Sequence, residues 1–188
     1  MTDFSPNAHL DFDVDTLSGM VPLRQVVFSL GSNLGDRLAH LQGAVDLLRM
    51  TPTLTIVDVS SVYETAPVGT VLDQPDFLNI VVRADSTLAS LVLLERAQAI
   101  EENFQRTREV PGGARTLDVD LVVVGNRVKN TPVLTLPHPR AHERAFVLLP
   151  WLEIDPAAVV PERGPVADLL RDVDTSGVRR RDDLAIDL

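Results

Sequence analysis

The sequence predicts a single domain in which strands and helices alternate. At 188 residues the chain is long enough to bury one substantial core. Its apolar and polar residues follow the order strand, helix, strand twice over, with further short elements behind. Aromatic residues make up only 4% of the chain, so Val, Leu and Ala must build most of the core.

The net charge of -10 and the absence of cysteine exclude several classes of protein. An acidic chain is unsuited to nonspecific contact with nucleic acid or with an anionic membrane. A chain without Cys has neither disulfides nor thiolate metal ligands. The sequence shows no signal-like start and no apolar run of membrane-spanning length. We therefore expect a cytoplasmic monomer with neither nucleic-acid nor membrane partners.

Composition divides the chain into three regions. Residues 1–23 carry four Asp among scattered apolar residues, which predicts an acidic, disordered leader. Packing of that leader on the domain through Phe4 and Phe12 is the alternative. The domain itself is expected over 24–173, and the Arg-containing tail at 174–188 is expected to be frayed.

The first half of the domain is predicted as strand, tight turn, helix and strand. An apolar strand at 25–30 precedes a Gly-containing turn at 31–36. Asp36 can cap the helix that apolar spacing predicts over 37–50. A β-branched stretch then predicts a long strand over 54–64. Because the Gly spacing fits neither the dinucleotide fingerprint nor the P-loop, we interpret the turn as a close turn only.

The second half repeats this order. A loop at 65–75 leads into a strand predicted over 77–84. Ser86 can cap a helix over 87–104, whose apolar residues recur at helical spacing. A Gly-Gly segment then precedes the strand at 115–124.

Shorter elements complete the domain. We expect a short strand at 127–129, an extended segment at 134–136, and helices over 142–152 and 166–173. His138 lies between two prolines and is therefore held by a stiff backbone. From the residues alone, a structural His and a ligand contact are equally good interpretations of it.

Asp118 and Asp120 are the residues best suited to carry chemistry. Side chains two apart on a strand share a face, so these carboxylates lie about 7 Å apart at the backbone. Neighbouring carboxylates repel, and a divalent cation between them removes that cost. Magnesium prefers one or two carboxylates, with phosphate oxygens completing its coordination. A solvated strand face is the other interpretation, and the arginine-rich context favours magnesium.

Arg106, Arg108 and Arg115 flank the Gly-Gly segment that leads to this strand. Guanidinium groups bind the nonbridging oxygens of polyphosphates, and a Gly-rich loop can close over them. On the preceding strand, Phe77 and Asn79 share one face and could hold a flat heterocycle. On local pattern alone, a core Phe and a strand-end Asn are the simpler interpretation.

Four motifs occur in a fixed order: Gly-Ser-Asn-Leu-Gly-Asp (31–36), Gln-Pro-Asp-Phe-Leu-Asn (74–79), Arg-Thr-Leu-Asp-Val-Asp-Leu (115–121) and Leu-Thr-Leu-Pro-His-Pro-Arg (134–140). Together they resemble the 6-hydroxymethyl-7,8-dihydropterin pyrophosphokinase family of folate biosynthesis, over about 26–161. The resemblance implies a ferredoxin-like α+β sandwich, with helices packed on a mostly antiparallel sheet. It also implies transfer of the terminal pyrophosphoryl group of ATP to the pterin hydroxymethyl group, with release of AMP.

The resemblance assigns roles to individual residues. Asp118 and Asp120 would bind two magnesium ions, and with Arg106 and Arg108 they would form the catalytic set. The positions matching the pterin pocket, with the two aromatic rings on either side of the pterin, are Thr65, Ala66, Val68, Phe77, Asn79 and Phe146. The positions matching ATP contacts are Glu101, Arg106, Arg108, Arg115, Leu121, Thr135, His138 and Arg144. The implied partners are ATP, the pterin and, as a further expectation, other enzymes of the folate pathway.

Two departures from the family pattern concern the nucleotide side. Family members commonly carry Arg-Trp before the Gly-Pro-Arg that opens the Asp strand, whereas residues 111–115 read Pro-Gly-Gly-Ala-Arg. We therefore expect weaker loop closure. Val133 stands where an arginine is often found. A pterin- or nucleotide-binding module without efficient catalysis is thus the main alternative, while the acidic charge opposes an RNA-binding domain of similar fold.

Overall fold

The structure is a computed structural model that describes residues 21–67, 74–104 and 114–188. Several predictions fall outside these residues: the leader up to residue 20, the pterin contact at Val68, and the arginines at 106 and 108. The departure at residues 111–113 also falls outside them.

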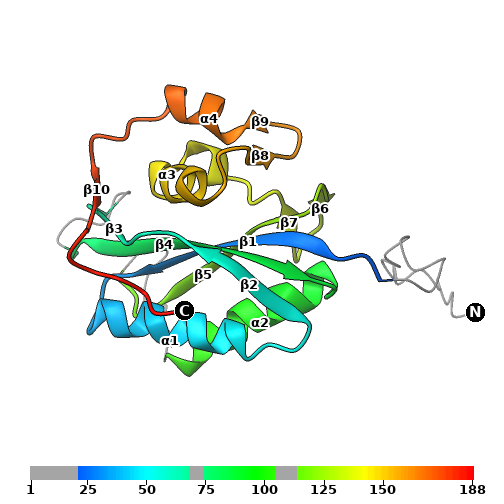
Figure 1. Cartoon of the computed structure of the whole chain (residues 1–188), viewed down its shortest axis with the longest axis horizontal. Coiled ribbons are helices and arrows are strands. Elements are labelled where there is room, and N and C mark those ends of the chain that lie inside the picture. Colours follow the sequence, from blue (N-terminus) through cyan, green and yellow to red (C-terminus); the bar gives the residue numbers. More distant parts are fainter. Residues whose placement is uncertain (1–20, 68–73, 105–113) are drawn as a thin grey trace, which may run out of the picture.

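A six-stranded antiparallel sheet is the centre of the fold (Figure 1). Its strand order is β10-β3-β4-β1-β5, and β2 also pairs with β4. This is the ferredoxin-like arrangement of two strand-helix-strand units, extended by one edge strand, and it confirms the expected α+β class. The strands are β1 (Arg24–Ser32), β2 (Leu54–Val59), β3 (Tyr63–Thr65), β4 (Phe77–Ser86), β5 (Asp118–Val124) and β10 (Val178–Arg180).

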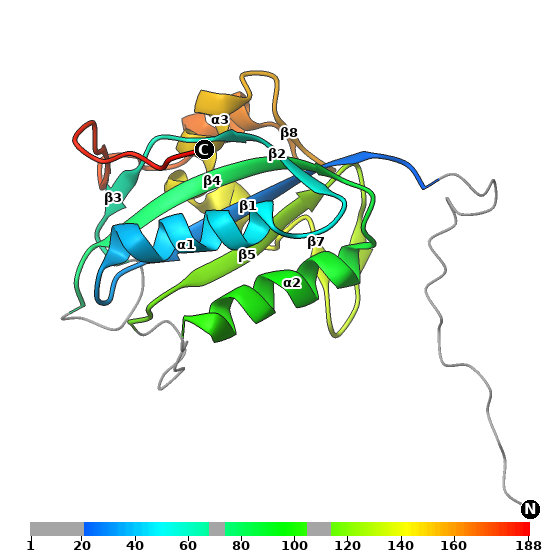
Figure 2. The same cartoon turned by 60° about the horizontal axis from the view of Figure 1, so that its bottom comes forward.

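Helices cover both faces of the sheet and give the molecule three layers (Figures 1 and 2). Helices α1 (Arg37–Arg49) and α2 (Ser90–Asn103) lie on one face, and α3 (Ala145–Ile154) and α4 (Val166–Leu169) lie on the other. The smaller elements are the strands β6 (Lys129–Asn130), β7 (Thr135–Leu136), β8 (Val159–Val160) and β9 (Gly164–Pro165), and the 3-10 turns Ala141–Glu143 and Leu170–Asp172. Among the described helices, none combines the length and apolar character needed to cross a bilayer.

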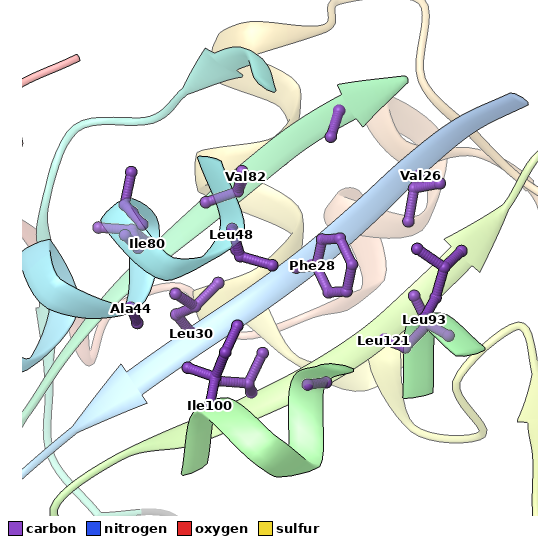
Figure 3. Packing of buried hydrophobic residues seen from close by; sticks show 14 of the residues in the cluster. Val26, Phe28, Leu30, Ala44, Leu48, Ile80, Val82, Leu93, Ile100 and Leu121 are labelled. Atoms are coloured by element: carbon purple, nitrogen blue, oxygen red, sulfur yellow. The ribbon is translucent and has the colours of Figure 1, made fainter. Parts of the chain in front are cut away.

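Strand alternation divides the core into two clusters. Phe28 and Leu30 of β1 are fully buried beneath α1 and α2 (Figure 3). Val27 on the same strand points to the opposite face, where it packs with Val81 and with Trp151 of α3. Because both faces are covered, the central strands are apolar on both sides, and a polar residue inside them stands out.

Several predicted boundaries of the first unit are confirmed, and one differs. Asp36 caps α1 by accepting a hydrogen bond of 3.1 Å from the amide of Ala39. Gly35 has the positive φ that the turn was expected to need. However, β1 continues to Ser32 rather than ending at residue 30, so Gly31 is a strand residue. Its backbone pairs with strands on both sides.

Two further predictions were wrong in detail. The long strand expected over 54–64 is two strands, because Ser60 interrupts it. The hydroxyl and the amide of Ser60 both bond the backbone of Val81 on β4. The expected cap at Ser86 is also wrong: α2 begins at Ser90. Ser86 instead accepts from the amide of Leu88 and donates to the carbonyl of Thr53.

The helices of the C-terminal part are shorter than predicted. The helix expected over 142–152 is a 3-10 turn followed by α3, which begins at Ala145. The helix expected over 166–173 is divided in the same way into α4 and a 3-10 turn.

The end of the chain differs most from expectation. Residues 174–188 were expected to be frayed, yet β10 forms antiparallel pairs with β3. Leu184 and Ile186 beyond it pack against the core on the α1 side. Backbone pairing and apolar burial together explain why this segment is ordered.

Candidate active site

A cavity of about 580 Å³ opens on the α3 face of the sheet. It lies where β1 and β3 end, where β4 and β5 begin, and beside the start of α3. Its lining includes Gly31, Thr65, Phe77 and Asp118. Antiparallel pairing makes these strand ends coincide, since Gly31 is opposite both Asn79 and Asp118. The register therefore brings residues from distant motifs to one place.

The residues assigned to the pterin come together on one side of this cavity. Those that the structure describes and places in the lining are Thr65, Ala66, Phe77, Asn79 and Phe146. The buried carboxamide of Asn79 donates a hydrogen bond of 2.9 Å to the Thr65 hydroxyl. Both Phe77 and Asn79 line the cavity, which a pterin-binding role requires, and their contact with a pterin stays a prediction.

Gly31 forms the floor of the cavity beside these residues. A Cβ at this position would lie 3.1 Å from Oδ1 of Asn79 and 3.7 Å from the ring of Phe77. The missing side chain thus lets the carboxamide and the ring sit close to the backbone of β1. The first motif therefore contributes this close approach through Gly31 as well as the turn at Gly35.

The two carboxylates lie in the same cavity, each beside an arginine. Both Asp118 and Asp120 line it, as the strand alternation predicted. Arg115 Nη2 lies 3.2 Å from an oxygen of Asp118, and Arg144 Nη1 lies 3.0 Å from an oxygen of Asp120. The four side chains are partly buried, so these pairs are shielded from solvent more than surface pairs are.

The same arginines also contact the aromatic side chains. The guanidinium carbon of Arg115 lies 5.5 Å from the centre of the Phe77 ring, and that of Arg144 lies 5.5 Å from the centre of the Phe146 ring. Both distances fall within the range of cation–π attraction. Each arginine therefore joins a carboxylate to an aromatic ring, and the acidic and aromatic halves form one site.

His138 lies next to Asp120. Its amide donates a 2.8 Å hydrogen bond to the carbonyl of Val122, which fixes the proline loop against β5. Its Nδ1 accepts from the amide of Arg140, and its Nε2 lies 3.8 Å from an oxygen of Asp120. Burial lowers the pKa of His138, Asp120 opposes that shift and Arg144 adds to it, and the net direction is downward. With Nδ1 accepting from Arg140, the Nε2 side of the ring faces the Asp120 carboxylate.

The donor set fits magnesium held jointly with phosphate. In the described ranges, no group of three or more His, Cys, Asp or Glu side chains is gathered closely enough to bind a metal unaided. Two carboxylates on one strand face are what a phosphate-bound Mg²⁺ needs from a protein. Arg115 and Arg144, which lie beside the two carboxylates, are suited to bind phosphate oxygens while the carboxylates bind the metal.

Besides His138, three of the described residues assigned to ATP lie outside the cavity lining. Glu101 is buried, and its Oε1 accepts a 2.8 Å hydrogen bond from the amide of Val119. Leu121 points with Val119 toward α1 and α2, because alternation sends it away from the two Asp. Thr135 lies on β7. Their contacts with ATP stay predictions.

Other lining residues were missed. Ser29 and Pro67 lie beside predicted residues, and Arg140 and Glu143 come from the segment before α3. A Ser two positions before Gly31, inside an apolar strand, was a signal that could have identified Ser29. The lining also includes Asp174, Gly177 and Val178 from the end of the chain, for which the sequence carried no signal.

Comparison with known proteins assigns the chain to a family. The sequence model of the 7,8-dihydro-6-hydroxymethylpterin-pyrophosphokinase (HPPK) family matches residues 27–156. The chain belongs to the HPPK family. The resemblance carried by the four motifs is thereby confirmed, because the matched region contains all of them.

Several bacterial HPPK proteins are similar along most of the chain, each named 2-amino-4-hydroxy-6-hydroxymethyldihydropteridine pyrophosphokinase. The Bacillus subtilis protein is 47% identical over 126 residues, which cover 67% of this chain and 75% of that protein. The Mycobacterium leprae protein is 48% identical, covering 76% and 78%. The Pseudomonas aeruginosa protein is 36% identical, covering 84% and 97%.

Solved HPPK structures share the fold. A triple mutant of Plasmodium falciparum HPPK-DHPS with pteroate has a TM-score of 0.65 at 16% identity, and the match covers 87% of this chain. The chain spans about half the length of that protein, since 47% of it is covered. An HPPK-DHPS in complex with substrates has a TM-score of 0.62 at 13% identity.

Proposed function

We propose that this protein transfers the β,γ-pyrophosphoryl group of ATP to the hydroxymethyl group of 6-hydroxymethyl-7,8-dihydropterin, releasing AMP. This is the activity of a 2-amino-4-hydroxy-6-hydroxymethyldihydropteridine diphosphokinase. One observation carries the proposal: in a chain of the HPPK family, Asp118 and Asp120 share a cavity with Phe77 and Phe146. A pterin and a triphosphate can therefore meet in one site.

The aromatic side of the cavity suits the pterin. A flat heterocycle can stack between the rings of Phe77 and Phe146. Arg115 contacts the first ring and Arg144 contacts the second. Asn79 offers a carboxamide held by Thr65, and a carboxamide can both donate to and accept from the ring edge. Val68 is proposed as a further pterin contact.

The acidic side suits the phosphates of ATP. Asp118 and Asp120 would hold magnesium, with two ions expected, which neutralises the phosphates and orients the chain of phosphorus atoms. Arg115 and Arg144 lie where they can bind nonbridging oxygens. Arg106 and Arg108 are proposed to close in from the preceding loop and to act with the two Asp in catalysis. Glu101, Leu121, Thr135 and His138 are proposed as further nucleotide contacts, as the resemblance implies.

The transfer balances as a simple displacement. The pterin hydroxyl oxygen bonds to the β-phosphorus, the bond from that phosphorus to the oxygen bridging α and β breaks, and its electron pair leaves with AMP. The hydroxyl proton is released to water, so that pterin and ATP give the pterin diphosphate ester, AMP and one proton. Charge spreads over the equatorial oxygens, so positioning and electrostatic stabilisation dominate the catalysis. His138, already directed at Asp120, is better placed to orient that carboxylate than to remove the proton.

A direct assay tests the proposal. The purified protein is incubated with ATP, magnesium and the pterin, and AMP is measured, with a control from which the pterin is omitted. We expect AMP to form only when the pterin is present, with one molecule of AMP for each molecule of pterin consumed. Binding of both ligands without AMP would instead favour the noncatalytic module, which the comparisons with known proteins do not support. The monomeric state, the cytoplasmic location and contacts with other folate-pathway enzymes stay predictions.

A further inference from the structure

The end of the chain is built into the edge of the cavity. We call residues 174–188 the C-terminal strap; they lie beyond the region that the family model matches. The strap leaves the α4 layer, pairs with the sheet through β10 and continues toward α1 (Figure 1). Asp187 and Gln42 of α1 exchange two hydrogen bonds of 2.8 and 3.0 Å at its far end.

Two arginines of the strap bind one buried carboxylate. Arg179 lies opposite Glu64 in the pairing of β10 with β3, and alternation sends Arg181 to the same face. Both guanidinium groups bond Oε2 of Glu64, at 2.5 and 2.9 Å, and Arg37 of α1 bonds its other oxygen at 3.1 Å. Burial opposes ionisation of Glu64, but these hydrogen bonds outweigh it and hold the pKa of this carboxyl below its ordinary value.

Arg180 attaches the strap to the other face of the sheet. It points toward α3, where its guanidinium lies 3.5 Å from an oxygen of Glu153. Glu153 also accepts from the hydroxyl of Tyr63 and from Ser61. Burial and the neighbouring Glu153 carboxylate raise the pKa of Tyr63 to about 12, so its hydroxyl keeps the proton that it donates. The strap is thus fixed to both helical layers.

The strap meets the pterin side of the cavity. Val178 lies opposite Thr65, and Thr65 lies opposite Phe77 on the next strand, so the three form one row across the sheet. Asp174, Gly177 and Val178 all line the cavity. None of the described carboxylate–arginine pairs beside Asp118 and Asp120 includes a strap residue. The strap therefore borders the proposed pterin pocket.

We propose that the C-terminal strap is a wall of the pterin pocket, and that Arg179 and Arg181 are positioning residues that act through Glu64 on Thr65. This rests on the proposed function, because it assigns the neighbouring half of the cavity to the pterin. Thr65 follows Glu64 directly on β3, and its hydroxyl accepts from the Asn79 carboxamide. Fixing the position of Glu64 therefore also fixes Thr65 and Asn79, the two side chains that would form hydrogen bonds with the edge of the pterin.

Gly177 allows a test of the wall. A Cβ at this position meets no atom within 4 Å, so a larger side chain fits the fold while occupying the rim of the cavity. In Gly177→Phe we expect the dissociation constant of the pterin to rise about tenfold or more, with that of ATP unchanged. The matched control is Ala185→Phe, an exposed position of the strap away from the cavity. Equal pterin affinity in both variants and the unaltered protein would overturn the proposal.

The arginine pair gives an independent test that does not depend on Gly177. Arg179→Ala with Arg181→Ala should raise KM for the pterin about tenfold, while kcat and KM for ATP change less than about twofold. The double Lys variant keeps the charges and should restore much of the pterin KM. A parallel loss of kcat and both KM values, or no change in any of them, would contradict a positioning role.

The unaltered protein separates failure of this proposal from failure of the function. Pterin binding and AMP formation by that protein establish the function itself. If it binds pterin and makes AMP while the strap variants behave like it, only the strap proposal is overturned. If it neither binds pterin nor makes AMP, the proposed function fails first, and the strap proposal falls with it.

Discussion

At the scale of single residues, the acidic pair is the part that the sequence predicted best. Alternation along one strand is a local property, so Asp118 and Asp120 could be placed on one face without knowing the fold. Arg115 is three residues from Asp118, and its contact with that carboxylate is also local. Arg144 reaches Asp120 from a distant segment, and only the assembled sheet and α3 bring the two together. Sequence order alone could not give that pair.

Removing one carboxylate should stop the chemistry without unfolding the protein. In Asp118→Ala we expect AMP formation to fall by about a thousandfold or more, because the charge that anchors magnesium at the phosphates is lost. Pterin affinity should be nearly unchanged, which fluorescence titration can measure. Asp46→Ala, at an exposed acidic position of α1, is the control and should keep full activity. Activity retained in the Asp118 variant would remove the metal assignment.

Gly31 gives a second prediction at this scale. The added methyl group of Gly31→Ala would lie 3.1 Å from Oδ1 of Asn79, so the carboxamide must shift. We expect the dissociation constant of the pterin to rise about five- to tenfold, about 1 kcal/mol, with ATP affinity unchanged. Isothermal titration with each ligand measures both constants. An unaltered pterin constant would show that the carboxamide does not need this close approach.

At the scale of elements, the types of the main helices and strands of the domain were predicted correctly, whereas several of their boundaries were not. The apolar spacing of α1 and its Asp36 cap are short-range signals, and both are confirmed. The interruption of the strand at Ser60 depends on bonds to Val81, and Ser86 bonds to Thr53 instead of capping α2. Each serine forms a hydrogen bond with a residue far away in the sequence. Short-range propensity therefore predicted the wrong strand end and the wrong helix cap.

The burial of α1 predicts how strongly that element stabilises the fold. Leu48 is fully buried between α1 and the sheet, so Leu48→Ala should lower the free energy of unfolding by about 2–4 kcal/mol. Met50 one position past the helix is 75% exposed, and Met50→Ala should change that free energy by less than about 0.5 kcal/mol. Urea denaturation of both variants makes the comparison. Equal midpoints would mean that α1 does not contribute to the core as described.

At the scale of the whole molecule, the antiparallel sheet with helices packed on it followed from the family resemblance, and the position of the closing segment did not. The two strand-helix-strand units predict a sheet with α1 and α2 on one face. The ionic contacts of Glu64 join β3 to α1 and to β10, and the residue from β10, Arg179, lies 115 positions from Glu64 along the chain. The tail that carries Arg179 and Arg181 was expected to be frayed, because the Glu64 carboxylate that both bind lies far away in the sequence.

The pKa shift of Glu64 predicts an acid-sensitive contribution to stability. A carboxyl whose pKa is lowered by folding stabilises the native state above its unfolded pKa, ordinarily 4.5, and loses that contribution as pH falls toward its folded pKa. Glu64→Gln should therefore be less stable than the unaltered protein at pH 7, by about 1–2 kcal/mol. The difference should shrink as the pH is lowered below 4.5. Thermal unfolding at several pH values measures it, and a difference independent of pH would contradict the ionic account.

A crystal structure with manganese, a nonhydrolysable ATP analogue and the pterin tests the central assignment most directly, because manganese replaces magnesium and is located by its anomalous scattering. We predict manganese bound by Asp118 and Asp120 together with phosphate oxygens, and the pterin stacked between Phe77 and Phe146 with its hydroxyl facing the β-phosphorus. Both carboxylates turned away from any cation, or a pterin bound elsewhere, would contradict the account.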